Sequence, residues 1–318
     1  MKRALVFPGQ GSQVVGMGQA LAGAFAEARE VFEEVDGALS QNLTKLMWEG
    51  PADDLKLTEN AQPALMAVSM AVIRVLDKQG KFHLPAAASF VAGHSLGEYS
   101  ALCAAGSFTL SDTARLLKKR GLAMQQAVPV GLGTMAALIG VDLPVAKEIA
   151  AAAAAQIGGG EVCTAANDNA PGQVVISGHT AAVDRAIAIA AERGFKRSVK
   201  LPVSAPFHCS LMKPAADVMR GALGEVEIKA PSVPLVANVT AQAVTDPAEI
   251  RELLVDQVTG AVRWRECVLF MKEQGVAQMV ECGAGSVLTG MAKRIDKEIM
   301  GVALSTPEDI EAFLKTQG

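Results

Sequence analysis

The sequence predicts an α/β protein with two lobes, a large one built on a mainly parallel β-sheet and a small one inserted into it. Apolar stretches of strand length alternate with amphipathic stretches of helix length over most of the chain, which is typical of a parallel sheet covered by helices. The order changes between residues 128 and 203, where two strand-like stretches follow each other directly. A length of 318 residues is enough for a large core and a second lobe.

The first part of the large lobe is expected over residues 1–127. The pattern predicts strands over 3–7 and 86–92, and helices over 14–39, 43–48, 63–78 and 98–106. Ser111 is expected to cap a further helix with one apolar face, which carries Ala114, Leu117, Gly121 and Met124. Strands that alternate with helices in this way imply a mainly parallel sheet.

The small lobe is expected over residues 128–203. The pattern predicts a strand over 134–141, a helix over 143–156, strands over 162–166 and 173–177, a helix over 181–193 and a strand over 196–203. This β-α-β-β-α-β order is the ferredoxin-like split motif, and its ends are punctuated by Gly131, Gly133 and Pro202. The large lobe resumes over 204–318 with strands at 235–239, 278–281 and 301–304, so it is discontinuous.

Composition and charge argue against several classes of protein. Charged residues break the apolar stretches well before membrane-spanning length, and the run 4–7 is too short for a signal-peptide core, so we expect a cytoplasmic protein without a membrane partner. The net charge of −4 lacks the basic excess of a nucleic-acid binder. The five cysteines are widely spaced without a C-x-x-C pair, so we expect reduced packing residues and neither a disulfide framework nor a metal site.

The most informative motif is Gly93-His94-Ser95-Leu96-Gly97, between a predicted strand and a predicted helix. A G-x-S-x-G turn at such a junction is tight and strained, and neither flank has room for a side chain. The serine projects beside free N–H groups at the helix start, which can stabilise an oxyanion. The motif predicts a nucleophile elbow and an α/β-hydrolase-like large lobe. Ser95 and Glu98 also fit a capping box, which explains neither glycine but can hold as well.

A serine hydroxyl needs a base within hydrogen-bond reach, most often a histidine. His94 lies in the turn and is expected to point away from Ser95, while His83 and His179 fall in loop and turn contexts. His208 lies where the chain re-enters the large lobe, so its position favours it, although a structural role is equally open. Because no nearby carboxylate has the pattern of a third triad member, a backbone or amide carbonyl can orient the imidazole instead.

Several further segments share one pattern with the elbow. In order they are Phe7-Pro8-Gly9-Gln10-Gly11-Ser12-Gln13, Lys119-Arg120-Gly121, Gly172-Gln173-Val174-Val175-Ile176-Ser177-Gly178, Phe207-His208, Asn238-Val239, Leu254-Val255-Asp256-Gln257 and Glu281-Cys282-Gly283-Ala284-Gly285. With these motifs the chain resembles the bacterial malonyl-CoA:acyl carrier protein transacylases over essentially its whole length. The family often has proline where Ala284 stands, a difference that touches none of the expected catalytic roles.

The resemblance implies a ping-pong transfer of the malonyl group from malonyl-CoA to the phosphopantetheine thiol of acyl carrier protein, which supplies extender units for fatty acid synthesis. It implies that Ser95 carries the malonyl group as an ester, and that His208 takes the proton of the serine and later activates the thiol. It also implies an oxyanion hole made by the backbone N–H groups of Gln10 and Leu96, and a carbonyl oxygen of Gln257 that orients His208. No cofactor is implied.

Arg120 is the residue that the resemblance assigns to substrate selection. Malonate keeps a free carboxylate, and a guanidinium binds a carboxylate through two parallel hydrogen bonds. From the residues alone the favoured interpretation is a solvated helix end with three consecutive bases, Lys118-Lys119-Arg120. Phe207 before His208 is similar to the malonyl-selecting form of that motif in the wider acyltransferase family.

An acyl carrier protein is acidic, so a basic docking surface is expected. Basic residues cluster around the last predicted strand of the small lobe, although a solvated face explains them as well; they are Arg193, Lys196, Arg197 and Lys200. The chain has no linker-like extension, so we expect a free-standing enzyme rather than an excised domain.

Three alternative functions stay open. The first is a serine hydrolase or thioesterase of α/β type, although its expected acid between Ser95 and His208 is not evident. The second is a polyketide-type acyltransferase with a different acyl selectivity. The third is a carrier-binding protein without activity, against which the intact set of Ser95, His208, Arg120 and Gln10 speaks.

Overall fold

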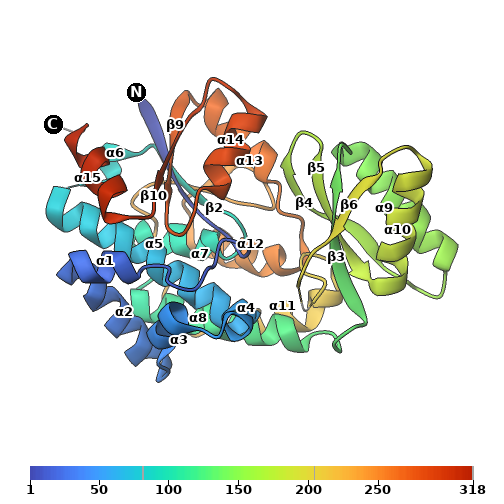
Figure 1. Ribbon diagram of the computed structural model, residues 1–318, viewed down its shortest axis with the longest axis horizontal. Coiled ribbons are helices and arrows are strands. Elements are labelled where there is room, and N and C mark those ends of the chain that lie inside the picture. The colour runs from blue at the N-terminus through green and yellow to red at the C-terminus, as the bar shows by residue number, and fades with distance from the viewer. Residues whose placement is uncertain (81, 204, 317–318) are drawn as a thin grey trace.

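The computed structural model describes residues 1–80, 82–203 and 205–316, and within them two separate β-sheets organise the chain (Figure 1). Sheet A has the strand order β10-β9-β1-β2-β7-β8, and all its neighbouring pairs are parallel except β7 with β8. Its strands are β1 (Lys2–Phe7), β2 (Phe90–Gly93), β7 (Leu235–Val236), β8 (Ala243–Val244), β9 (Val276–Cys282) and β10 (Met300–Leu304). The predicted mixed α/β class with a mainly parallel sheet is confirmed.

Helices cover both faces of sheet A, and the strand β1 shows why. Side chains alternate along a strand, so Leu5 and Phe7 join the apolar core on one face while Ala4 and Val6 join a second core on the other. The first core includes α5 (Thr58–Gly80), α7 (Gly97–Ala104) and α8 (Leu110–Gln126). The second includes α13 (Trp264–Glu273) and α14 (Val287–Ile295). Burial on both faces explains the continuous apolar runs of these strands.

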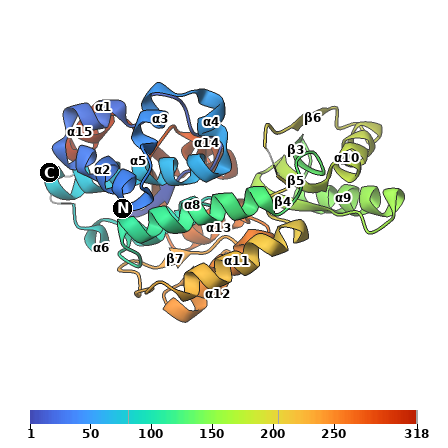
Figure 2. The same cartoon turned by 90° about the horizontal axis from the view of Figure 1, so that it is seen from below.

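The other helices complete this covering. They are α1 (Gln19–Ala24), α2 (Ala26–Leu39), α3 (Leu43–Glu49), α4 (Ala52–Lys56), α6 (Leu84–Ala87), α11 (Lys213–Gly224), α12 (Pro247–Thr259) and α15 (Pro307–Lys315), with a 3-10 turn η1 (Ser210–Met212). Figure 2 shows α8, α11 and α12 along one side of the molecule, where α11 contacts both α8 and α12. Over the described ranges we find no helix with the length and apolarity needed to cross a membrane.

Sheet B is formed by one continuous stretch of the chain and lies apart from sheet A (Figure 1). Its strands β3 (Gly133–Ile139), β4 (Cys163–Ala170), β5 (Gln173–His179) and β6 (Arg197–Lys200) have the order β4-β5-β3-β6, and every pair is antiparallel. The helices α9 (Leu143–Ile157) and α10 (Thr180–Glu192) share a core with this sheet. Small side chains on α9, such as Ala146, Ala150 and Ala153, are buried in that core and allow close packing.

Glycines explain why the prediction of one helix over 14–39 is wrong. Gly16 and Gly18 have φ values of 96° and 78°, a left-handed conformation that ends helical geometry, so α1 begins only at Gln19. A second break falls at Phe25, whose φ of −128° and ψ of 125° are extended. Residues Ala26–Leu39 then form the amphipathic helix α2.

Three further predictions for this part of the chain are wrong in their bounds. The apolar run 86–92 is not one strand, because the short helix α6 precedes β2, which begins at Phe90. The cap of α8 is Thr109 and not Ser111, since the Thr109 side chain accepts the Asp112 N–H at 3.0 Å. The helix expected over 63–78 begins earlier, at Thr58. The other predicted elements are present, with bounds that differ by a few residues. The strands expected over 196–203 and 235–239 are shorter than predicted. Residue 204, where the large lobe was expected to resume, lies outside the described residues.

The strands β1 and β2 bring two loops together at one edge of sheet A. They are parallel neighbours, and Phe7 pairs with Gly93 at their ends. The loop 8–11 and the turn 93–97 therefore leave the sheet side by side at its carboxyl edge. In open parallel sheets this edge is where ligands bind.

Candidate active site

The turn from β2 to α7 has the geometry of a nucleophile elbow. Ser95 has a φ of 54°, in the left-handed region that non-glycine residues rarely adopt. A Cβ placed on Gly93 would lie 1.9 Å from the backbone of Gly97, and one placed on Gly97 would lie 2.2 Å from the carbonyl oxygen of Phe7. Both glycines are therefore required by close backbone approach, as the motif predicted.

Replacing Gly97 with alanine is expected to lower the free energy of unfolding by about 3 kcal/mol, because the new methyl group must displace the end of β1. Thermal or denaturant unfolding measures this loss. Gly221→Ala is the matched control, since it lies inside helix α11 where a Cβ meets nothing within 4 Å; alanine there should stabilise by ~0.5–1 kcal/mol. Equal effects at the two glycines would contradict the steric account of the elbow.

The capping-box interpretation of Ser95 and Glu98 is wrong. The residue that precedes α7 is Leu96, and no side chain caps this helix. The Ser95 hydroxyl instead lies 2.8 Å from Nε2 of His208 and accepts a hydrogen bond of 3.1 Å from Nη2 of Arg120. The Glu98 carboxylate faces inward and accepts hydrogen bonds from Asn238 and Gln257. Ser95 and Glu98 therefore bond to residues that are distant in the sequence and do not form a capping box with each other.

His208 is buried with both ring nitrogens engaged. Its Nδ1 lies 2.9 Å from the carbonyl oxygen of Gln257 and 3.2 Å from that of Gly260. Because carbonyls only accept, Nδ1 carries the proton, and Nε2 is left with a lone pair toward the Ser95 hydroxyl. Burial and then the charge of Arg120 lower the pKa of His208 to about 3, so the imidazole is neutral at pH 7. The predicted carbonyl partner of His208 is present at Gln257.

Arg120 is buried, with 1% of its surface exposed, in the interior of helix α8. Its Nη1 donates to Oε1 of Gln62 at 2.8 Å, and its Nη2 donates to Oε1 of Gln257 at 2.8 Å as well as to Ser95. Its guanidinium carbon lies 5.6 Å from the centre of the Tyr99 ring. The interpretation of this residue as part of a solvated helix end is therefore wrong. A buried cation beside the serine hydroxyl is suited to binding an anionic group.

The predicted oxyanion donors lie beside Ser95 in the same cavity. Within the described part of the chain, the backbone N–H groups of Gln10 and Leu96 donate to no protein acceptor. The loop that carries Gln10 packs tightly on the elbow, since a Cβ on Gly9 would lie 2.7 Å from the carbonyl oxygen of His94. Two free amides next to a nucleophile can hold a developing oxyanion.

A cavity of about 380 Å³ encloses these groups between the carboxyl edge of sheet A and sheet B. The polar residues of its lining include Gln62, Ser95, Arg120 and His208. Its wall is mostly apolar and comes from α8, β3 and the segment that follows β6; this wall includes Met124, Met135, Leu201, Val203 and Phe207. A small acyl group fits such a site, with the few polar groups fixing its orientation.

Sequence reasoning missed the role of Asn238, which follows β7 and is completely buried. Its Oδ1 accepts the Ser95 N–H at 2.8 Å, and its Nδ2 donates to the Gly93 carbonyl oxygen at 2.7 Å. Both bonds hold the strained turn. The available signal was a single amide side chain in an otherwise apolar run, residues 235–239. His94 also has a partner that was missed, because its Nε2 lies 2.8 Å from Oδ1 of Asn169 on β4.

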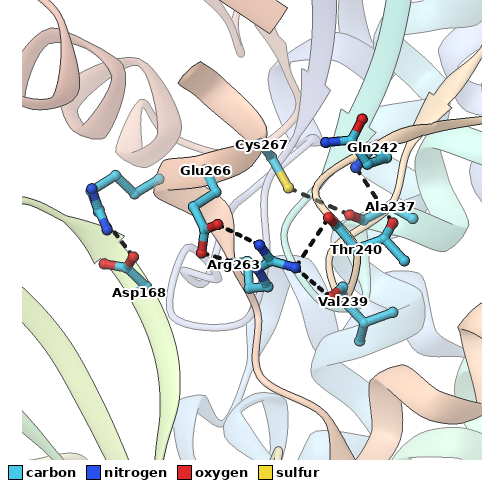
Figure 3. A network of polar contacts seen from close by, with 9 residues as sticks. Asp168, Ala237, Val239, Thr240, Gln242, Arg263, Glu266 and Cys267 are labelled. Atoms are coloured by element: carbon cyan, nitrogen blue, oxygen red, sulfur yellow. Dashed lines mark hydrogen bonds and ion pairs between the residues drawn. The ribbon is translucent and has the colours of Figure 1, made fainter. Parts of the chain in front are cut away.

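A polar network centred on Arg263 lies at the loop that follows β7 (Figure 3). Arg263 forms an ion pair with Glu266 and donates from Nη1 to the carbonyl oxygens of Val239 at 3.2 Å and Thr240 at 3.1 Å. Its backbone N–H also donates to the carbonyl oxygen of Asn238. The start of α13 therefore fixes the loop that carries Asn238.

The same region ties sheet B to the large sheet. Asp168 of β4 is almost completely buried, and its Oδ2 accepts a hydrogen bond of 2.9 Å from Nε of Arg265. The Asp168 N–H donates to the Val262 carbonyl oxygen, and the Val262 N–H donates to that of Ala166. These contacts join β4, whose Asn167 lines the cavity, to the segment at the start of α13.

The remaining sequence-based expectations concern metals, cysteines and basic residues. In the ranges 1–80, 82–203 and 205–316, no group of three or more His, Cys, Asp or Glu residues is placed to hold a metal ion. The five cysteines are free and buried. Of the basic cluster near β6, Arg193 pairs with Glu148 and Lys200 with Asp184. Lys196 and Arg197 are exposed.

A mainly parallel sheet, a serine on a tight strand-to-helix turn and a histidine on its hydroxyl are typical of α/β proteins that form acyl-serine esters. Comparison with known families agrees with this class. The model of the acyl transferase domain family matches residues 4–307. The chain therefore belongs to the acyl transferases.

Individual relatives identify a narrower family within the acyl transferases. A malonyl CoA-acyl carrier protein transacylase of Escherichia coli (strain K12) is 45% identical over 98% of this chain and 98% of its own length. The crystal structure of an acyl-carrier-protein-S-malonyltransferase from Bartonella henselae matches with a TM-score of 0.96 and 56% identity, over 99% of both chains. A malonyl-transacylase solved with its type II PKS acyl-carrier protein matches with a TM-score of 0.94 and 40% identity, over 99% of this chain and 100% of that one. The chain belongs to the malonyl CoA-acyl carrier protein transacylase family.

Proposed function

We propose that this acyltransferase moves the malonyl group of malonyl-CoA to the phosphopantetheine thiol of an acyl carrier protein through a malonyl ester on Ser95. The observation that carries the proposal is the buried Arg120 guanidinium, which lies within hydrogen-bond distance of the Ser95 hydroxyl. A buried cation is costly unless an anion pairs with it, and a malonyl group supplies a carboxylate for that pair. The names of the full-length relatives support the same substrate and acceptor.

In the first half-reaction, the Ser95 hydroxyl gives its proton to Nε2 of His208 while its oxygen attacks the thioester carbon. The carbonyl oxygen becomes an oxyanion that the amides of Gln10 and Leu96 bind. Collapse of this intermediate breaks the carbon–sulfur bond, and the imidazolium of His208 protonates the departing CoA thiolate. The malonyl group is then an ester of Ser95.

In the second half-reaction, the phosphopantetheine thiol gives its proton to His208 and its sulfur attacks the ester carbon. The ester bond breaks, and His208 returns the proton to the Ser95 oxygen. The Gln257 carbonyl holds Nδ1–H throughout, so Nε2 stays directed at the reacting atoms. An ionised acid is not needed for this orienting role.

Arg120 selects the substrate and also tunes the base. Its charge lowers the pKa of His208 in the unliganded site. A malonyl carboxylate bound to Arg120 offsets that charge, so the correct substrate makes His208 a stronger base. Phe207, which lines the cavity, is assigned to the exclusion of larger acyl groups.

We propose supply of extender units for fatty acid synthesis as the role of the product. A polyketide-type role is the alternative, since one structural relative was solved with a type II PKS acyl-carrier protein. The hydrolase or thioesterase alternative differs only in the acceptor, which would be water.

The ratio of malonyl carrier protein to free malonate among the products distinguishes a transferase from a hydrolase. With malonyl-CoA and a holo acyl carrier protein, we expect malonyl carrier protein as the main product, and free malonate only as a minor one. Without carrier protein, release of CoA should stop after one equivalent per enzyme, apart from slow hydrolysis. Continuous release of malonate at the same rate with and without carrier protein would instead establish a hydrolase.

We further propose that the chain divides into an α/β-hydrolase-like lobe over 1–127 and 204–318 and a ferredoxin-like lobe over 128–203. The strand order of sheet B and its separate core with α9 and α10 support this division. The cavity then lies between the lobes, where ligand sites are common.

A further inference from the structure

The carboxyl group of Glu98 lies beneath the elbow, completely buried, and the mechanism does not use it. Its Oε2 accepts the backbone N–H of Asn238 at 3.0 Å and Nε2 of Gln257 at 2.9 Å. Its Oε1 has no hydrogen-bond partner among the residues that the structure describes. A buried carboxyl group is costly, so its retention at this place calls for a role.

The side-chain amide of Gln257 connects Glu98 to Arg120. Nε2 of this amide donates to Glu98, and Oε1 accepts from Nη2 of Arg120 at 2.8 Å. The opposite orientation would place the amide oxygen against a carboxylate and the amide NH₂ against a guanidinium. Two oppositely charged neighbours therefore fix which way the amide points.

We propose that Glu98 is a positioning residue that orients Gln257 and supplies a buried counter-charge to Arg120 without a direct ion pair to its guanidinium. Through this role Glu98 sets how strongly the site discriminates malonyl from acetyl groups. This inference rests on the proposed function. A carboxylate paired directly with Arg120 would use the donors that the substrate carboxylate needs. The intervening amide oxygen takes a single donor of Nη2, whereas a carboxylate paired directly with Arg120 would take two.

The charge of Glu98 matters differently for the two acyl groups. A malonyl group brings its own carboxylate to Arg120, whereas an acetyl group leaves Arg120 with Glu98 as its nearby counter-charge. Loss of the Glu98 charge therefore impairs acetylation more than malonylation, because an unbalanced cation opposes formation of the His208 imidazolium. A loosened site would do the opposite and reduce the preference for malonyl.

The pKa values of Glu98 and of the ionisable groups near it are well separated. These groups are Arg120 on α8, Tyr99 on α7, Cys267 on α13, and the histidines His94 and His208 near Ser95. Burial raises the pKa of Glu98 to about 7 and that of Tyr99 to about 12, and it raises the pKa of Cys267 above its usual range. It lowers the pKa of His208 to about 3 and that of His94 below its ordinary value.

Glu98 is therefore the group in this set expected to change charge between pH 6 and 8, and it gains a proton as the pH falls. The test compares wild type with Glu98→Gln, which retains an oxygen to accept both hydrogen bonds but has no charge. Glu281→Gln is the matched control, because Glu281 is also buried and accepts backbone N–H groups, those of Leu288 and Thr289, at the start of another helix. The readout is the ratio of the apparent second-order rate constants for acylation of Ser95 by malonyl-CoA and by acetyl-CoA.

We expect the wild-type ratio to rise about fivefold between pH 8 and pH 6 as Glu98 is protonated. The Glu98→Gln ratio should stay at the high value at every pH, and Glu281→Gln should follow wild type. Equal ratios for wild type and Glu98→Gln, or a lower ratio in the variant, would overturn the proposal and leave Glu98 a purely structural role.

Two further outcomes of this experiment also have a definite meaning. If Glu98→Gln does not fold, the wild-type ratio alone decides, because a ratio that is constant between pH 6 and 8 contradicts the proposal. If wild type takes no malonyl group from malonyl-CoA, the proposed function itself fails, and the two failures are thereby distinguished.

Discussion

Replacing Ser95 with alanine is expected to reduce the rate of malonyl transfer by about 10⁵-fold or more, to the level of the background reaction. The serine oxygen forms the ester bond in the first half-reaction and is released from it in the second, and His208 and Arg120 have no other nucleophile to act on. Single-turnover measurement of CoA release from malonyl-CoA gives the loss directly. The fold should be retained, because the removed hydroxyl lies at the cavity and alanine tolerates this backbone conformation about as well as serine does.

Ser100→Ala is the control for this prediction. Ser100 lies on the same helix α7 and is completely buried, and its hydroxyl has no hydrogen-bond partner within the described residues. Its loss should leave the transfer rate within about twofold of wild type. Substantial activity in Ser95→Ala, at about one per cent of wild type or above, would contradict an ester on Ser95.

The second large effect is expected for Arg120→Ala, which should lower the preference for malonyl-CoA over acetyl-CoA by about 10- to 100-fold. A charged hydrogen bond contributes about 1.5–3 kcal/mol, and tenfold corresponds to about 1.4 kcal/mol. Most of the loss should appear as a higher KM for malonyl-CoA. Arg120→Lys should restore part of the preference, because lysine keeps the charge but cannot form the two parallel bonds.

Arg115→Ala is the matched control for Arg120. It removes an arginine from the same helix, but one that faces solvent and pairs with Asp112. Neither KM nor preference should change, and stability should shift by about 0.5 kcal/mol or less. If Arg120→Ala slowed malonyl and acetyl transfer equally, Arg120 would have a structural role and the assigned basis of selectivity would be wrong.

The sequence predicted well those parts of the molecule that depend on neighbouring residues. The strand at β1, the turn at Ser95 and the order of the elements of sheet B all follow from local periodicity and glycine spacing. The elbow was predictable because its two glycines belong to one five-residue motif, although the contact that requires Gly97 comes from Phe7 on β1. The starts of helices were less predictable. The break before Gln19 depends on the left-handed conformations of Gly16 and Gly18, which the apolar pattern does not show.

The site depends on contacts that the local pattern does not contain. Glu98 has a good local partner in the predicted capping box, yet it bonds to Asn238 and Gln257, which lie 140 and 159 positions away in the chain. Arg120 follows two lysines and has the local pattern of a surface residue, but its burial is decided by α5 and α12, which supply Gln62 and Gln257. The resemblance assigned Arg120 where the local pattern alone favoured another interpretation.

The most direct test of the account is the intact mass of the protein after brief incubation with malonyl-CoA, followed by addition of holo acyl carrier protein. We expect wild type to gain one malonyl group, located on Ser95 by peptide mapping, and to lose it to the carrier protein. Ser95→Ala should gain none. A malonyl group on another residue, or transfer to the carrier protein without any covalent enzyme intermediate, would contradict the proposed ping-pong mechanism.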